Sequence, residues 1–253
     1  MNKKNKKITI IIQARSDSKR FPRKVLSIIK GRPLLWHVIN RAKRMKYDDL
    51  VVATTTRTID NEIAQIARNS NVKCFRGKTN DVLDRFFNAA KRYDSDIIVR
   101  ITADCPLIDP IESNKVIDKF LSGKYDYVTS DDKTYPKGID TECFSFNVLK
   151  KVWKNAKLKS EREHVTPYIW KNSKKFKIGK VYNKISTPQR WVVDYKDDLI
   201  FIKKIYNRLY QNDNVFLVSD VLQVIRKEPM LLKINQYHDP NEGYNLSLKN
   251  DFT

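Results

Sequence analysis

Residues 8–26, ITIIIQARSDSKRFPRKVL, decide the fold of this chain. The apolar run at 8–12 predicts a buried strand, and a helical pattern begins at Pro33. Between them, a polar loop carries five cations within ten residues: Arg15, Lys19, Arg20, Arg23 and Lys24. Open α/β sheets build anion sites from a strand, a loop and a helix in this order. So many cations at a strand end favour a polyanion, and a nucleoside triphosphate is the first hypothesis. A solvated basic turn is the alternative.

Apolar runs alternate with helical patterns through the first half of the chain. Four strand–helix units in a row predict a parallel sheet with right-handed crossovers. Asp109 followed by Pro110 predicts a helix start, and Gly123 predicts the end of the same helix. We expect strands at 10–13, 50–55, 72–75, 96–101 and 126–130, and helices at 33–45, 59–70, 81–93 and 110–123.

The alternation breaks at about residue 135. Asp197 and Asp198 lie at the positive end of an expected helix at 197–210. The segment RWVVDY, residues 190–195, alternates as a strand would. We expect one α/β domain over 1–253, with an inserted arm at about 135–190 and a C-terminal extension at 211–253. The further expected elements are strands at 139–147 and 175–183, and helices at 147–157, 161–172 and 219–227, before an irregular tail.

The bulk composition is that of a soluble globular protein, with 41% hydrophobic and 31% charged residues. The net charge of +21 is extreme, so a nucleic-acid-binding protein is one alternative. However, the lysines are spread along the whole chain, and aromatic residues are not interleaved with them as stacking platforms would be. A Lys-rich surface on a protein that handles small anions is the favoured interpretation, with no nucleic-acid partner expected.

The cysteines and the apolar runs indicate the compartment. Cys74, Cys105 and Cys143 form no CxxC pair, which argues against a disulfide framework or a zinc site and suits a reducing cytoplasm. The N-terminal MNKKNKK precedes only five apolar residues, too few for a signal peptide. No run approaches the length of a membrane span, so we expect a cytoplasmic protein without a membrane partner.

Two carboxylates follow apolar segments and are candidate metal ligands. Asp104 comes just after the strand expected at 96–101, where ligands bind in parallel sheets. Asp194 ends the strand expected at 190–195. Together they would hold Mg²⁺, which neutralises triphosphate charge. The alternative is that Asp104 serves a turn before Pro106 and that Asp194 caps a helix.

Two further segments are candidates for binding an anion or a sugar. SEREHVTPYI, residues 160–169, places Arg162 and His164 at a helix start. YPKGIDTECF, residues 135–144, predicts a tight turn at Lys137 beside a ligand, with Asp140 and Glu142 as acceptors for hydroxyl groups. A structural role is the alternative for each. We expect packing alone to explain His37.

The segment IIQARSDSKRFPRKVL followed by GRPLLWHVINRAKR resembles the sugar-acid cytidylyltransferase superfamily, whose members open with an ARxxSxRxPxKxL loop. The SpsF-type branch, named for spore-coat polysaccharide biosynthesis, is more similar. There the resemblance runs through VVATT, FRGKTNDVLDRF, VRITADCPLIDP, YPKGIDTECFS, EREHVTPYI, RWVVDYKDDL and NEGYNLSL, and covers nearly the whole chain.

The resemblance implies a GT-A-like nucleotidyltransferase fold and Mg²⁺-dependent transfer of CMP from CTP to a sugar, a sugar acid above all, with release of pyrophosphate. It implies a role in surface glycan synthesis and a homodimer supported by the arm. Arg15, Lys24 and Asp104 would be catalytic, and Asp104 and Asp194 would bind the metal. The residues implied for the nucleotide are Gln13, Ala14, Arg15, Ser18, Arg20, Lys24, Arg76, Asp81, Arg85 and Arg100. Those implied for the sugar are Lys137, Asp140, Glu142, Arg162 and His164.

The chain departs from this pattern in the opening loop. Asp17 and Lys19 stand where the family often has smaller or apolar residues, and Arg23 stands where it usually has Gly. Because Gly tolerates backbone angles that Arg does not, Arg23 either adds charge or alters the turn that presents Lys24. A GT-A-type glycosyltransferase is the enzymatic alternative. An Asp-x-Asp motif would favour it, but the string here is Thr-Ala-Asp-Cys.

Overall fold

A computed structural model of the protein describes residues 6–183, 189–211, 214–239 and 241–251. The remaining parts of the expected arm, of the C-terminal extension and of the charged N-terminus lie outside the described residues.

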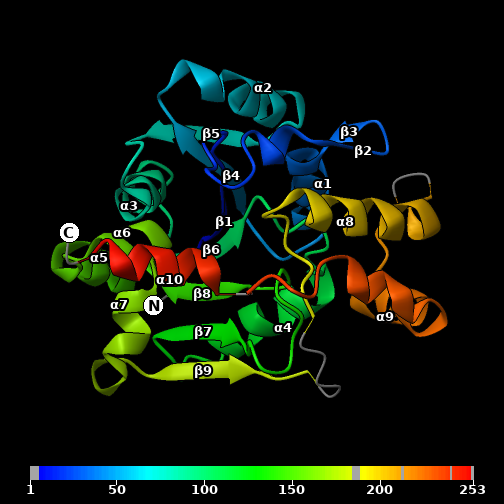
Figure 1. Ribbon diagram of the computed structural model, residues 1–253. Coiled ribbons are helices and arrows are strands. Elements are labelled where there is room, and N and C mark those ends of the chain that lie inside the picture. Colours follow the sequence, from blue (N-terminus) through cyan, green and yellow to red (C-terminus); the bar gives the residue numbers. More distant parts are fainter. Residues whose placement is uncertain (1–5, 184–188, 212–213, 240, 252–253) are drawn as a thin grey trace.

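A mixed sheet forms the centre of the fold (Figure 1). Among the described residues it has seven strands in the order β5-β4-β1-β6-β8-β7-β9. β8 runs antiparallel to both neighbours, and the other pairs are parallel. The expected fold class, a mostly parallel sheet flanked by helices, is confirmed. The strands are β1 (Ile8–Gln13), β4 (Asp49–Thr55), β5 (Lys73–Gly77), β6 (Ile97–Thr102), β7 (Tyr127–Ser130), β8 (Glu142–Ser145) and β9 (Ile178–Val181).

Helices cover both faces of the sheet because the central strands are apolar on both. In β1, Ile10 and Ile12 enter one core and Ile11 enters the other. The first core is covered by α1 (Leu34–Ala42), α2 (Asn61–Asn69), α4 (Pro110–Leu121), α8 (Lys196–Leu209) and α9 (Val218–Lys227). The second is covered by α3 (Val82–Arg92), α5 (Phe146–Asn155) and α7 (Pro167–Lys171).

Short elements complete the chain. A hairpin of β2 (Ile28–Ile29) and β3 (Arg32–Pro33) precedes α1. Asp109 caps α4, and Gly123 has a left-handed backbone just after this helix, as expected. His37 is buried against Tyr206, as packing predicts. The 3₁₀ turns are η1 (Lys24–Leu26), η2 (Thr58–Asp60), η3 (Ser173–Lys175) and η4 (Pro229–Ile234).

The strand order places the site. After β1 the chain builds β4 and β5 on one side and then crosses to β6 on the other, so the order reverses between β1 and β6. At their carboxyl ends Gln13 pairs with Thr102. Ligands bind at such switch points in open α/β sheets. The cationic loop after β1 and the Asp104 loop after β6 therefore open onto the same crevice.

The expected strand at 190–195 is wrong. Only Arg190 forms a β-bridge, to Lys137, and the apolar residues between Arg190 and Asp194 are all buried. The backbone is held locally instead: Trp191 N–H donates to the Lys137 carbonyl (2.7 Å), and Val193 N–H donates to the Asp104 carbonyl (2.8 Å). Alternation of residue types reports burial, but it does not say whether a neighbouring strand is present.

Two further expectations fail in the second half of the chain. The helix expected at 161–172 is divided into α6 (Lys159–His164) and α7, because Val165 between them has a φ of 72°. The tail after α9 is not irregular, since it forms η4 and then α10 (Glu242–Lys249). The segment expected to be an inserted arm contributes β8 and β9 to the main sheet and α5 to α7 to its cover.

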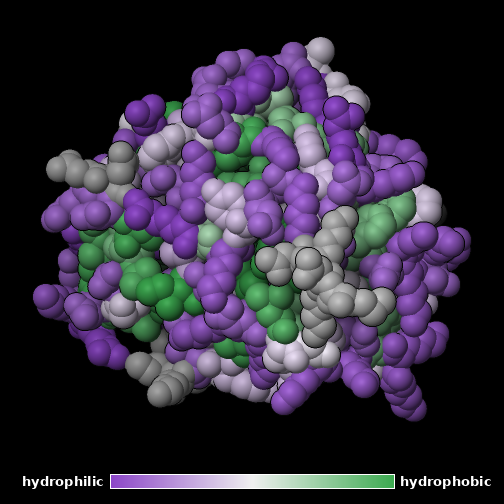
Figure 2. Space-filling view, turned by 180° about the vertical axis from the view of Figure 1, so that it is seen from behind, coloured by the Kyte–Doolittle hydropathy of each residue, from purple (hydrophilic) through white to green (hydrophobic). Residues whose placement is uncertain are grey.

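Hydrophilic side chains cover most of the face shown in Figure 2, and hydrophobic residues show between them. None of the helices formed by the described residues combines the length and the apolar character that crossing a bilayer requires.

Gly138→Ala is expected to destabilise the protein more than Gly123→Ala. Both glycines have positive φ, but a Cβ at Gly138 would lie 2.7 Å from the backbone of Trp191 and Val192, whereas none of the described atoms lies within 4 Å of a Cβ at Gly123. Backbone strain costs about 1–2 kcal/mol at either position, and the clash adds roughly 1–3 kcal/mol at Gly138. Urea unfolding of the two variants measures the difference. Equal losses would contradict this account of the turn.

Candidate active site

One lysine joins the two predicted metal ligands. Lys24 follows the cationic loop, and its Nζ donates to Asp104 Oδ2 (2.6 Å) and to Asp194 Oδ1 (2.7 Å). The Lys24 side chain is 10% exposed, while Asp104 and Asp194 are 22% and 17% exposed. The hydrogen bond from Val193 N–H to the Asp104 carbonyl brings the two acidic segments together. Three elements distant in sequence thus meet at one ammonium group.

The charges of this cluster support one another. Burial by itself lowers the pKa of Lys24. The facing carboxylates of Asp104 and Asp194 together raise this pKa by more than burial lowers it, so the net shift is upward. Burial likewise raises the pKa of Asp194, yet Lys24 and Arg20 hold it well below its usual range. Lys24 and Asp194 are therefore both charged at neutral pH, and their contact is an ion pair.

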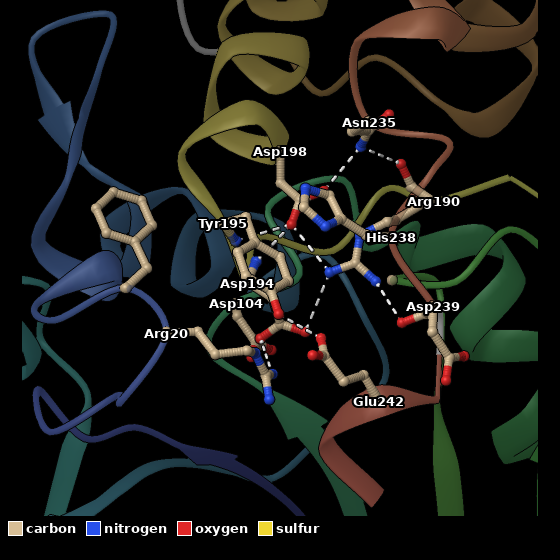
Figure 3. Close-up of polar contacts among 12 residues, drawn as sticks. Arg20, Asp104, Arg190, Asp194, Tyr195, Asp198, Asn235, His238, Asp239 and Glu242 are labelled. Atoms are coloured by element: carbon tan, nitrogen blue, oxygen red, sulfur yellow. Dashed lines mark hydrogen bonds and ion pairs between the residues drawn. The ribbon is translucent and has the colours of Figure 1, made fainter. Parts of the chain in front are cut away.

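Further cations surround the cluster. Arg20 Nη2 lies 2.9 Å from Asp194 Oδ1 (Figure 3). Arg15 Nη2 donates to Glu163 Oε1 at 3.0 Å. Arg85 is buried and donates to the Lys78 carbonyl at 2.6 Å. Burial, assisted by the charge of Arg15, lowers the pKa of Arg85 to about 10, which leaves it cationic. Arg15 and Arg20 each pair with one carboxylate, and Arg85 donates to a carbonyl group. Guanidinium groups gathered in this way form a site suited to phosphate oxygens.

These groups line a cleft of about 1140 Å³. Asp17 pairs with Arg57, while Lys19 lines the cleft. The structure brings most of the predicted site residues together there. Those that line it are Gln13, Ala14, Arg15, Ser18, Arg20, Lys24, Arg85, Arg100, Asp104, Lys137, Asp140, Glu142, His164 and Asp194.

Three predicted residues do not line this cleft. Arg76 donates to the carbonyls of Thr55 (2.8 Å) and Arg57 (2.7 Å), and so fixes the loop after β4. Asp81 caps α3, and Arg162 binds it through Nε (2.8 Å) and Nη2 (2.7 Å). Asp81 and Arg162 line a smaller neighbouring hollow of about 390 Å³. In the absence of a ligand these contacts hold elements together.

Glu142 is held by the protein at both carboxylate oxygens. Arg100 binds Oε2, and Tyr127 and Thr166 donate to Oε1, the latter at 2.6 Å. Lys137 and Asp140 form the turn at Gly138, whose N–H donates to Asp140 at 2.9 Å. The turn is tight, as the sequence predicts.

His164 belongs to a short chain of polar contacts. Its Nε2 lies 2.9 Å from the Ser247 hydroxyl, which donates to Glu163 Oε2 at 2.7 Å. Burial, helped by the nearby Arg100, Lys137 and Arg15, lowers the pKa of His164 to about 4, although Glu163 acts in the opposite direction. His164 is therefore neutral at pH 7. Through Glu163 the chain reaches Arg15.

Several residues at this site were not predicted from the sequence. Asp60 is buried and accepts from Ser16 N–H (2.7 Å) and from Thr55, which anchors the cationic loop. Glu163 lies inside the SEREHVTPYI segment, but no role was predicted for it. α10 lines the cleft through Asn245 and Ser247 among others. The motif NEGYNLSL was the one signal for α10, and it carried no assigned role.

The turn at Arg23 keeps a glycine-like backbone. Arg23 has a φ of 60° and a ψ of 19°, in the left-handed region, and its N–H donates to the Ser16 carbonyl at 2.8 Å. Its guanidinium pairs with Glu62 Oε1 at 2.7 Å, on the exposed surface. The departure from Gly is therefore accommodated without loss of the turn that presents Lys24.

The pair Asp104 and Asp194 fits a Mg²⁺ ion. The two carboxylates converge on one cation and remain partly exposed to the cleft. No group of three or more His, Cys, Asp or Glu side chains suited to a metal occurs among the described residues. Mg²⁺ commonly takes one or two carboxylates and completes its shell with water and substrate phosphates.

The comparisons with known proteins agree with this geometry. A family model described as cytidylyltransferase matches residues 9–231. The uncharacterized protein MJ1063 of Methanocaldococcus jannaschii is 46% identical over 173 residues, 68% of this chain and 70% of that protein. The spore coat polysaccharide biosynthesis protein SpsF of Bacillus subtilis is 28% identical over 235 residues, 88% of this chain and 95% of that protein.

A solved cytidylyltransferase from Leptospira borgpetersenii superposes with a TM-score of 0.87 at 34% identity, and covers 92% of this chain and 99% of its own. Shorter matches are to 3-deoxy-manno-octulosonate cytidylyltransferases. That of Trichlorobacter lovleyi is 37% identical over 115 residues, 45% of each chain.

His164→Gln is expected to reduce the acid sensitivity of the fold. An ordinary histidine has a pKa near 6.5, and His164 has one of about 4. Between these values the unfolded chain binds a proton that the folded protein does not, so stability falls as pH decreases, by at most about 1.4 kcal/mol per pH unit. Gln keeps a nitrogen for Ser247 without titrating. Urea unfolding at pH 7 and pH 5 compares the two proteins. If the free energy of unfolding falls by the same amount from pH 7 to pH 5 in both proteins, the low pKa of His164 is contradicted.

Arg23→Gly is expected to be more stable than Arg23→Ala by about 1 kcal/mol, because Ala at positive φ is strained and Gly is not. Both variants lose the exposed ion pair with Glu62, so their difference isolates the backbone. Thermal unfolding measures it. If the Ala variant is as stable, the left-handed turn is not maintained in solution.

Proposed function

The chain belongs to the cytidylyltransferase family, and from this premise we propose that it transfers CMP from CTP to a small sugar acid with release of pyrophosphate. The family model and the SpsF relative confirm the resemblance seen in the residues, and the protein is a nucleotidyltransferase. The ammonium group of Lys24 between Asp104 and Asp194, at the switch point of the sheet, is the observation that supports the proposal most strongly.

The nucleotide half of the cleft is formed by the loop after β1. Arg15, Arg20 and Lys24 supply positive charge where a triphosphate would lie. Gln13, the last residue of β1, and Ala14 after it line the same cleft. Such groups act in a preorganised, partly water-excluded site, where hydrogen bonds to phosphate oxygens are strong. CTP is the proposed nucleotide because of the family.

The acceptor half lies toward Lys137, Asp140 and His164. The Lys137 ammonium provides hydrogen-bond donors for a carboxylate or hydroxyl group. Asp140 accepts from hydroxyl groups, and so does the second ring nitrogen of neutral His164, whose N–H is directed to Ser247. The relation to 3-deoxy-manno-octulosonate cytidylyltransferases supports a sugar acid. The name of the SpsF relative supports a role in surface polysaccharide synthesis.

In the proposed reaction an acceptor hydroxyl oxygen attacks the α-phosphorus in line and its proton passes to solvent. The bond to the pyrophosphate oxygen breaks, and pyrophosphate leaves. Catalysis consists of positioning and electrostatic stabilisation. Arg15 and Lys24 balance the charge that develops on the leaving group. Asp104 and Asp194 would hold a Mg²⁺ ion, which would neutralise phosphate charge when bound. The transfer requires neither a covalent enzyme intermediate nor a nucleophilic side chain.

A cytoplasmic, homodimeric enzyme remains part of the proposal. Cys74, Cys105 and Cys143 are free thiols, which suits a reducing compartment. Size-exclusion chromatography with light scattering tests the dimer.

CTP with Mg²⁺ is expected to raise the melting temperature more than UTP, ATP or GTP does. A ligand that binds only the folded state at 100 times its Kd stabilises by about 2.7 kcal/mol, or roughly 5–10 °C for a chain of this size. Asp104→Asn should lose the Mg²⁺-dependent part and most pyrophosphate release with 3-deoxy-manno-octulosonate as the first acceptor tried. A response to nucleoside diphosphates or sugar nucleotides instead of CTP would indicate a glycosyltransferase.

A further inference from the structure

The C-terminal segment (235–239 and 241–242) packs against the loop that carries Asp194. Figure 3 shows Asn235, His238, Asp239 and Glu242 gathered around the loop that carries Asp194. Asn235 is 2% exposed, and its Nδ2 donates to the Arg190 carbonyl (3.0 Å) and to Asp198 Oδ1 (2.9 Å). A residue more than 35 positions away in sequence therefore fixes both ends of the Arg190–Asp198 segment.

Arg190 uses all three guanidinium nitrogens within this network. It is 7% exposed. Nε donates to Asp198 Oδ1 (2.8 Å), and Nη2 donates to Asp198 Oδ2 (3.0 Å) and to Asp194 Oδ2 (3.3 Å). Nη1 donates to the Asp239 carbonyl (3.2 Å). Such a fork has one orientation, so Arg190 fixes the carboxylate of Asp194 from behind.

Asp198 fixes the backbone at the same place. It is fully buried, and its Oδ2 accepts from the N–H groups of Asp194 (2.8 Å) and Tyr195 (2.9 Å). The Tyr195 ring stacks on His238, with centroids 4.0 Å apart, and its hydroxyl donates to Glu242. The C-terminal segment thus contacts this network through His238 and Glu242, which hold the Tyr195 side chain.

The two oxygens of Asp194 consequently have different partners. Oδ2 is held by Arg190, while Oδ1 faces Lys24 and Arg20 in the cleft. Partners that orient a ligating carboxylate commonly change metal affinity 10- to 100-fold when they are removed. We propose that Arg190, Asp198 and Asn235 are positioning residues for Asp194, so that the C-terminal segment completes the metal site. The inference rests on the proposed function.

A charge-balanced double variant tests the network. Arg190→Met with Asp198→Asn removes both buried charges together, and the Asn oxygen still accepts from the backbone. Arg208→Met with Glu228→Gln is the matched control, because this pair joins two helices on the exposed surface through the same kind of fork. Asn235→Ala, with Asn155→Ala as its control, covers the case in which the double variant does not fold.

The experiment measures Mn²⁺ binding in the presence of CTP, with electron paramagnetic resonance to detect the bound ion. Melting curves establish that each variant is folded. The half-saturating Mn²⁺ concentration should rise at least about 10-fold in the double variant and several-fold in Asn235→Ala, and stay within about twofold in both controls. CTP affinity without metal should change less than the Mn²⁺ affinity, which a general loss of structure would not produce.

The outcomes separate the two proposals. Failure of the wild-type protein to form a Mn²⁺–CTP complex refutes the proposed function. If the wild-type protein forms the complex, and the folded double variant and Asn235→Ala bind Mn²⁺ with the same affinity as the wild type, the positioning role alone is refuted.

Discussion

The salt bridges of Lys24 with Asp104 and Asp194 are the interaction on which the site depends. The single buried ammonium of Lys24 compensates both carboxylates, so its removal would leave two like charges facing each other. The cluster also joins the loop after β1, the loop after β6 and the segment before α8. Substrate phosphates and a metal would enter a site whose geometry is already set by this balance.

Buried ion pairs replace regular backbone pairing where the sheet ends. Residues 190–195 lack strand partners along most of their length, and Arg190 and Asp198 hold them instead. Arg162 and Asp81 join α6 to the start of α3 in the same manner. Arginine suits these places because its planar fork fixes a carboxylate in one orientation. The loops that form the cleft are thereby kept in place without being part of the sheet.

Much of the candidate site follows from the sequence, for a specific reason. Arg15, Arg20 and Lys24 lie in the segment that follows β1, and Asp104 lies in the loop after β6. Parallel strands bring their carboxyl ends to one edge. Arg76 was assigned to the site by resemblance, and Arg162 also by its place in the SEREHVTPYI segment. In the structure their side chains bind carbonyls and a helix cap. A cation in a motif does not reveal whether its partner is a ligand or the protein itself.

The sequence by itself determined the α/β class, the alternation of strands and helices in the first half and the cationic loop, because these depend on periodicity and on local composition. Only the tertiary structure decided that 190–195 is not a strand, that Arg23 adopts a left-handed turn, and that α10 and Asn235 reach the site. Except for the turn at Arg23, these depend on partners far away in the chain, such as Asp104 for Val193 or Asn235 for Asp198. Local pattern carries no information about such partners, since burial and hydrogen bonding at these positions are set by the packing of the whole chain.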